Sequence, residues 1–110
     1  MGRDPVNRGD LYLCDFGDPV GHEPGFRRPA LVVSPAQFNR HGVAIVLPVT
    51  KTRRGYPTHI ELDGPLPVVS YVQCELVRAV SEHRIVRQVG QVDGLVLEQV
   101  GIVLRRLMVL

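Results

Sequence analysis

The sequence lacks the motifs that identify most nucleotide-binding and metal-dependent enzymes. It contains no G-x-G-x-x-G segment, no P-loop, no H-E-x-x-H and no C-x-x-C pair, so it does not support a dinucleotide site, an NTP site or a structural zinc. The histidines are too scattered to form a ligand set with recognisable spacing. We therefore expect neither a metal nor another cofactor. The four histidines are His22, His41, His59 and His83.

Cysteine is rare, tryptophan is absent, and long apolar runs are missing. The longest apolar stretches, 43–49 and 107–110, fall far short of the ~18 residues that suggest a membrane span. No basic and apolar signal segment opens the chain, so a cytoplasmic protein without a membrane partner is expected. Cys14 and Cys74 are far apart in sequence. We expect two small buried side chains, with a disulfide or a redox role as the alternatives.

Acidic residues are scarce in the middle of the chain. Residues 21–60 carry six Lys or Arg against one Glu, a net charge of +5, whereas residues 1–20 have a net charge of −2 and residues 61–110 of −1. A concentration of positive charge is expected for a surface that meets phosphate groups, and a merely solvated basic face is the alternative. The basic residues are Arg27, Arg28, Arg40, Lys51, Arg53 and Arg54.

The apolar pattern predicts one small, mainly β (α+β) domain over residues 1–110, with 1–8 as a loose lead-in. Six short strands with frequent turns favour a strongly bent antiparallel sheet or barrel closed by a C-terminal helix. Ser34 and Pro35 should begin a helical turn, Pro48 should interrupt the ladder of its strand, and Ser81 should cap a short turn. The strands are expected at 11–16, 30–34, 43–50, 58–62, 68–80 and 85–92.

The last segment predicts an amphipathic helix that begins after Asp93 as N-cap. Val96, Val100, Val103, Leu104 and Leu107 share one face and should meet the core. A second stripe, Leu95, Ile102 and Val109, recurs at seven-residue spacing. This stripe packs either on a second chain or within the same core.

Five separated segments occur in an order that resembles the MazF/PemK family of toxin ribonucleases, from Arg8 to the final helix. They are "RGDLYLCDF", "PVGHEPGFRRPALVVSPAQFNR", "VLPVT", "GYPTHIEL" and "VQCELVRAVS". The resemblance implies an SH3-like barrel of the CcdB/PemK/MazF type with short helices, usually assembled as a homodimer. It also implies the toxin of a type II toxin–antitoxin system. Such a toxin is a metal-independent, sequence-selective endoribonuclease that cleaves single-stranded RNA, including mRNA, and inhibits growth.

The same resemblance assigns roles to individual residues. Arg28, which immediately precedes the proline of the family pattern, would neutralise the scissile phosphate, and Thr50 would donate its hydroxyl to a phosphate oxygen. Glu23 falls on an acidic position associated with general-base or orienting work, and His22 on a histidine with a phosphate-binding or stabilising part. Glu75 retains the carboxylate of the family's second acid–base segment.

Two departures from the family pattern fall in that segment. Gln73 stands where the PemK branch has an arginine and cannot act as a proton donor in the same way, and Leu76 replaces a polar residue. Arg27 would point to the opposite face of its strand from Arg28, and Tyr56 either stacks on an unpaired base or packs. The expected RNA contacts are Arg27, Lys51, Arg53, Arg54, Tyr56, Gln73 and Arg78.

The implied partners are RNA, a cognate MazE-like antitoxin with a disordered acidic tail, a second copy of the chain and, through the antitoxin complex, operator DNA. One competing function is a nucleic-acid-binding barrel that does not cleave. Another is a CcdB-like gyrase poison, which would need an aromatic C-terminal tail that this chain lacks.

Overall fold

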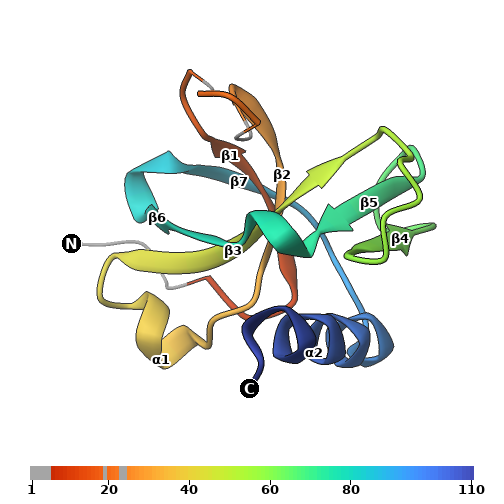
Figure 1. The fold of residues 1–110 in the computed structure, drawn as a ribbon. Coiled ribbons are helices and arrows are strands. Elements are labelled where there is room, and N and C mark those ends of the chain that lie inside the picture. The colour runs from red at the N-terminus through yellow and green to blue at the C-terminus, as the bar shows by residue number, and fades with distance from the viewer. Residues whose placement is uncertain (1–5, 19, 23–24) are drawn as a thin grey trace.

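A computed structural model describes residues 6–18, 20–22 and 25–110 (Figure 1). In these residues seven antiparallel strands form one sheet, accompanied by two α-helices and two short 3-10 turns. The strands are β1 (Asp10–Asp15), β2 (Arg27–Val32), β3 (Val43–Thr50), β4 (His59–Leu62), β5 (Ser70–Gln73), β6 (Arg78–Ser81) and β7 (Ile85–Gln91). The helices are α1 (Ala36–Asn39) and α2 (Gly94–Met108), and the 3-10 turns are η1 (Cys74–Leu76) and η2 (Glu82–Arg84).

Strand β3 is the central strand of the sheet, whose order is β4-β5-β3-β2-β1-β7. One side of β3 pairs with β2. The other side pairs first with β6, over Val43–Val46, and then with β5, at Val49 and Thr50. Pro48 has no N–H to donate and lies between these two ladders, which confirms the predicted interruption.

The predicted mainly β fold with short helices and a C-terminal helix is confirmed, but two details of the prediction are wrong. The sheet is not closed into a barrel, because β4 and β7 end the strand order and no ladder joins them in the described residues. The single bent strand expected at 68–80 is broken by η1 into β5 and β6, which pair with different parts of β3. A 3-10 turn cannot continue a ladder, so pairing with β3 stops after β5 and resumes at β6.

The turn predicted at Ser34 forms, but Ser34 does not cap it. Pro35 is the N-cap of α1, and no side chain caps the helix. The Ser34 hydroxyl donates instead to Asn39 Oδ1 and accepts the backbone N–H of Ile45 at 2.8 Å. The hydroxyl is therefore committed to joining α1 to β3. The predicted caps Ser81 and Asp93 are confirmed, since they accept from His83 N and Val96 N respectively.

The start of the described chain is tied to α1. Residues 1–5 of the lead-in predicted at 1–8 lie outside the described residues. Val6 is buried, and its carbonyl accepts from Asn39 Nδ2 at 2.7 Å. The part of the lead-in that the structure describes is thus packed at Val6.

Two apolar clusters stabilise the sheet from its two faces. The first gathers Cys14, Ala30, Val46 and neighbouring side chains, and the second gathers side chains from β1 to β5 around Leu31. Helix α2 covers the second cluster through Val100, Val96, Val103 and Leu104, and lies beneath the sheet in Figure 1. No helix among the described residues is long and apolar enough to span a membrane.

The cysteines are confirmed as small buried side chains. Neither forms a disulfide, and both are fully buried. Burial raises the pKa of Cys14 to about 12. Burial, together with the negative charge of Glu75, raises the pKa of Cys74 to about 12. Both thiols therefore remain protonated and unreactive near neutral pH.

Candidate functional site

The sheet brings Arg28 and Thr50 to the same end of two paired strands. Strand β2 pairs with β3 at Ala30–Pro48 and Leu31–Leu47. Arg28 lies two residues before Ala30 on β2, and Thr50 lies two residues after Pro48 on β3. Residues two apart on a strand share a face, so both side chains lie on the face of the Ala30–Pro48 pair. Two residues separated by a helix and a strand in sequence thus become neighbours.

Arg28 and Thr50 border one open hollow of about 320 Å³. Arg28 is half-buried, and its Nε is buried without a hydrogen-bond partner among the described residues. Thr50 Oγ1 accepts the backbone N–H of Thr52 at 3.2 Å, and this bond leaves the hydroxyl hydrogen free to donate. We call this space the Arg28 hollow. Its lining residues are Leu13, Arg27, Arg28, Pro29, Val49, Thr50, Lys51 and Thr52.

Arg27 differs from Arg28 in exposure and in partner. It pairs in register with Asp15, and its Nε lies 3.9 Å from Asp15 Oδ2. Both side chains are largely exposed, so this ion pair contributes little. Alternation along β2 puts Arg27 on the opposite face from Arg28, as predicted, although both side chains reach the hollow.

A small apolar pocket of about 140 Å³ adjoins the Arg28 hollow and shares Pro29, Val49, Thr50 and Lys51 with it. The segment after β4 supplies the rest of its wall, which is mostly apolar. The additional lining residues are Leu66, Pro67, Val68 and Ser70.

The basic loop that follows Thr50 is exposed throughout residues 51–57. Lys51 borders the Arg28 hollow, and Arg54 borders a second hollow described below. Arg53 lies between them in sequence and is exposed. The loop therefore carries positive charge from one hollow to the other.

The second hollow has a volume of about 380 Å³ and draws its walls from distant parts of the chain. It brings together five of the residues predicted from the sequence, from the segment before β2, the basic loop, and the end of β5 with η1. We call it the Glu75 hollow. Its lining residues are His22, Arg54, Tyr56, Gln73, Glu75 and Leu76.

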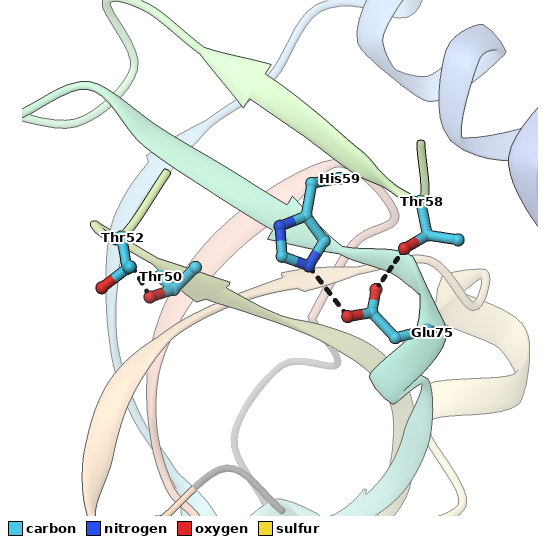
Figure 2. A network of polar contacts seen from close by, with 5 residues as sticks. All are labelled: Thr50, Thr52, Thr58, His59 and Glu75. Carbon is cyan, nitrogen blue, oxygen red and sulfur yellow. Dashed lines mark hydrogen bonds and ion pairs between the residues drawn. The ribbon is translucent and has the colours of Figure 1, made fainter. Parts of the chain in front are cut away.

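Glu75 is held by two hydrogen bonds (Figure 2). Thr58 Oγ1 donates to Glu75 Oε1 at 2.8 Å, and His59 Nε2 lies 2.8 Å from Glu75 Oε2. Burial alone would raise the pKa of this carboxyl group. Hydrogen bonds from His59, from its own backbone N–H and from Thr58, with the charge of His59, outweigh burial and hold the pKa of Glu75 below its usual range.

The two hollows lie on the same face of the sheet. Thr50 pairs with Tyr71 on β5, and Gln73, two residues along β5, pairs with His59 on β4. Paired residues share a face, as do residues two apart on one strand. Gln73 is only 6% exposed, and its Oε1 has no partner in the described part of the chain. A polar row therefore runs across the sheet from Arg28 to His59.

Three of the predicted site residues are not placed at either hollow, and the first of them is Arg53, in the basic loop. Arg78 lies on β6, and its guanidinium stacks over the Phe16 ring at 5.3 Å. This contact engages it elsewhere on the molecule, and its predicted role in RNA binding stays a prediction. Glu23 lies outside the described residues.

Sequence reasoning missed Thr58, His59 and Tyr71. The pattern of "THIEL" puts His59 on the opposite face from the buried Ile60 and Leu62, which marks it as a residue of a polar face. Nothing in the pattern shows that this face meets Glu75. Among the described residues, no three His, Cys, Asp or Glu side chains gather in an arrangement that could hold a metal ion.

Comparison with known proteins gives matches over almost the whole chain. A family model described as "PemK-like, MazF-like toxin of type II toxin-antitoxin system" matches residues 7–108. Endoribonuclease EndoA of Bacillus subtilis is 31% identical over 101 residues, which cover 86% of this chain and 87% of that protein. MazF of Deinococcus radiodurans has a crystal structure that is 33% identical, with a TM-score of 0.87 and coverage of 96% of this chain and 98% of that one. A MazE–MazF crystal structure from the same organism is 34% identical, with a TM-score of 0.83 and 96% coverage of both chains.

Proposed function

The chain belongs to the family of PemK-like, MazF-like toxins of type II toxin–antitoxin systems, and it is an endoribonuclease. From this premise we propose that it cleaves single-stranded RNA without a metal, at the Arg28 hollow. The observation that carries the proposal is that Arg28 and Thr50, from the paired strands β2 and β3, border one open hollow. A phosphate oxygen is a strong acceptor for the N–H groups of a guanidinium at such a hollow.

The reaction assigned to this site is attack by the ribose 2′-OH on the adjacent phosphorus. The 2′-O–P bond forms, the P–O5′ bond breaks, and the products carry a 2′,3′-cyclic phosphate and a 5′-OH. Arg28 supplies charge-assisted donors to the equatorial oxygens as negative charge develops, and Thr50 adds a neutral hydroxyl donor. The 2′-OH proton passes to a carboxylate, for which Glu23 and Glu75 are the candidates, and O5′ gains a proton as it leaves.

RNA would run from the Arg28 hollow along the basic loop to the Glu75 hollow. Lys51, Arg53 and Arg54 are exposed and suited to backbone phosphates. Tyr56 is half-exposed at the wall of the Glu75 hollow and offers a face for an unpaired base. His22 and Gln73 border the same hollow. A path with two separate pockets supports sequence-selective rather than random cleavage.

The cognate antitoxin is the protein partner, as the MazE–MazF structure of the relative supports. An acidic tail would complement the basic loop and block both hollows. Binding of operator DNA through such a complex belongs to the same proposal. We further propose that the toxin acts in the cytoplasm, where its RNA substrate occurs.

A homodimer is proposed from two exposed apolar side chains of α2, Leu95 and Ile102, and from Val109 at its left-handed C-cap. Leu95, Ile102 and Val109 are 63%, 44% and 88% exposed, so the alternative that they enter the core of this chain is wrong. Exposed apolar stripes of this kind favour packing on another chain. Two copies would present two basic grooves.

One assay tests the proposed function against its competitors. Purified protein is incubated with a long single-stranded RNA in excess EDTA, and the fragments are mapped and their ends identified. Discrete fragments with 2′,3′-cyclic phosphate ends support the proposal. Binding without fragments would favour the non-cleaving alternative, and inhibition of gyrase supercoiling without RNA cleavage would favour the gyrase poison. Cleavage that requires Mg²⁺ and leaves a 5′-phosphate would overturn the mechanism.

A further inference from the structure

The buried imidazole of His59 contacts two residues that line the Glu75 hollow. The His59 side chain is only 3% exposed, whereas Glu75 is 30% exposed and reaches the hollow. The Tyr56 ring packs on His59, with ring centroids 5.0 Å apart and a 56° angle between the planes. His59 therefore touches two residues of the hollow without bordering it.

The hydrogen bond to Glu75 determines which ring nitrogen of His59 carries a hydrogen. An ionised carboxylate can only accept, so Nε2 carries the hydrogen that joins it to Oε2 over 2.8 Å. The other ring nitrogen, Nδ1, is buried and has no partner among the described residues. Burying an unpaired polar atom is unfavourable, so an apolar ring would suit this position better if packing were its only task.

The two bonds also fix the orientation of the carboxylate. One oxygen accepts from Thr58 and the other from His59, and these donors are adjacent in sequence at the start of β4. Strand β4 pairs with β5, which leads directly into η1 and Glu75. Figure 2 shows both donors reaching the carboxylate from the same strand end. Rotation of the Glu75 side chain would break both bonds at once.

We propose that His59, assisted by Thr58, is a positioning residue that holds the Glu75 carboxylate in one orientation at the wall of the hollow, where it meets hydrogen-bond donors of the bound RNA. The proposal rests on the proposed ribonuclease function and concerns how one of its residues is prepared. His59 itself touches no RNA. Its effect on cleavage passes entirely through Glu75.

The charge state of Glu75 provides a direct readout. The groups that face it are His59 at the start of β4 and Thr58 just before it, Cys74 beside it, and His22, Arg54 and Tyr56 at the same hollow. Among these, the His59 and Thr58 bonds stabilise the ionised form through direct contact. Loss of either donor should therefore raise the pKa of Glu75.

The first experiment follows the Glu75 carboxyl carbon by NMR during a pH titration of the protein without RNA. His59→Phe keeps an aromatic ring but removes the donor, so the titration should move to higher pH. His59→Gln retains an N–H in a similar place and should titrate close to the parent. His83→Phe, a change at an exposed histidine, should have no effect. An unchanged Glu75 titration in His59→Phe would overturn the proposal.

A second pair of variants, at Thr58, keeps the proposal testable if the His59 variants fail to fold. Thr58→Val removes only the hydroxyl and Thr58→Ser restores it, so the titration should move to higher pH in the first and return in the second. Equal titrations in the two variants would contradict the proposal in the same way. This titration needs no RNA, so its result does not depend on whether the chain cleaves RNA.

The second experiment measures cleavage of a short RNA as a function of pH. His59→Phe should lower kcat/KM by about tenfold, as expected for a charged hydrogen bond that is no longer made in the right place, with recovery in His59→Gln. If Glu75 is the base, the acid limb of the profile should also move to higher pH. If Glu75 only binds RNA, KM should rise while kcat is retained. Unchanged kinetics in His59→Phe would refute the positioning role, whereas a parent protein that cleaves no RNA would refute the proposed function instead.

Discussion

The Arg28 hollow and the Glu75 hollow hold their charged groups in opposite ways. Arg28 has a buried Nε with no partner among the described residues, and Thr50 accepts a single bond of 3.2 Å. Glu75 is tied by two bonds of 2.8 Å to residues of one strand end. The first hollow leaves its donors for a ligand, while the second uses donors of the protein to fix an acceptor. The comparison teaches that one site can combine hydrogen-bond donors available to a charged ligand, at Arg28 and Thr50, with an acceptor, the Glu75 carboxylate, that the protein already holds in one orientation.

The largest effect is expected from changing the substrate instead of the protein. A single 2′-deoxynucleotide on the 5′ side of the cut removes the proposed nucleophile, so cleavage should be abolished. Binding should persist, because neither hollow depends on that hydroxyl for its charge. Gel-based cleavage and fluorescence anisotropy on the matched oligonucleotides measure the two quantities. Cleavage of the deoxy substrate would show that water, and not the ribose, is the nucleophile.

The next effect concerns the donors of the Arg28 hollow. Arg28→Ala and Thr50→Val should each reduce kcat by about 10²–10³, the usual cost of removing one donor to a developing anion. The fold should survive, because neither side chain belongs to an apolar cluster. Single-turnover cleavage and thermal melting provide the measurements. Arg27→Ala is the matched control and should lose much less; greater sensitivity at Arg27 would mean that the assignment of the two arginines is reversed.

A smaller effect is expected from the loop between the hollows. If Lys51, Arg53 and Arg54 bind phosphates, replacing all three with Gln should weaken binding and flatten the salt dependence. The log–log slope for single-stranded RNA should change by about 0.7 for each phosphate that the protein no longer neutralises. Affinity measured over a salt series provides the test. A slope equal to that of the parent would place the RNA backbone on another surface.

The smallest effect concerns the stability that the Glu75 network contributes. Since the pKa of Glu75 is lowered on folding, its contribution is present above the ordinary value for a carboxyl group and is lost as pH falls through the folded-state pKa. Glu75→Gln should therefore be less stable than the parent at pH 7, by on the order of 1 kcal/mol. The difference should shrink in acid. Urea unfolding at several pH values measures it, and a difference that grows in acid would contradict the network.

The Arg28 hollow could be predicted from the sequence more completely than the Glu75 hollow. Strand alternation separates Arg27 from Arg28, and an apolar run ending in Thr50 marks a strand end, so both features follow from local pattern. The resemblance to a family then connects them. The link between His59 and Glu75 spans sixteen residues and depends on the pairing of β4 with β5. Pairing of this kind is set by tertiary packing and leaves no local signal.

The errors in the fold prediction have a similar origin. The segment 68–80 has β-forming residues on both sides of η1, and its short interruption carries no Gly or Pro to mark a break, so the sequence pattern continues the strand across η1. Whether the segment forms one long strand or two short ones depends on which residues of β3 are free to pair with it. Ser34 carries the right residue type for an N-cap, but competition from Asn39 and Ile45 for its hydroxyl becomes visible only in three dimensions.

The change of partner along β3 has a consequence for the order in which backbone amides open to solvent. One side of the strand is covered by β2, and the other passes from β6 to β5 at Pro48. Fraying of either half of the sheet leaves the middle of β3, Val46–Pro48, paired with the remaining half, so the amides of this part should be among the last to exchange with deuterium. Thr50 ends the strand, paired with Tyr71 of β5, and the exposed loop of residues 51–57 begins at the next residue. RNA can thus reorder a rapidly exchanging loop while the hydroxyl of Thr50 keeps its place.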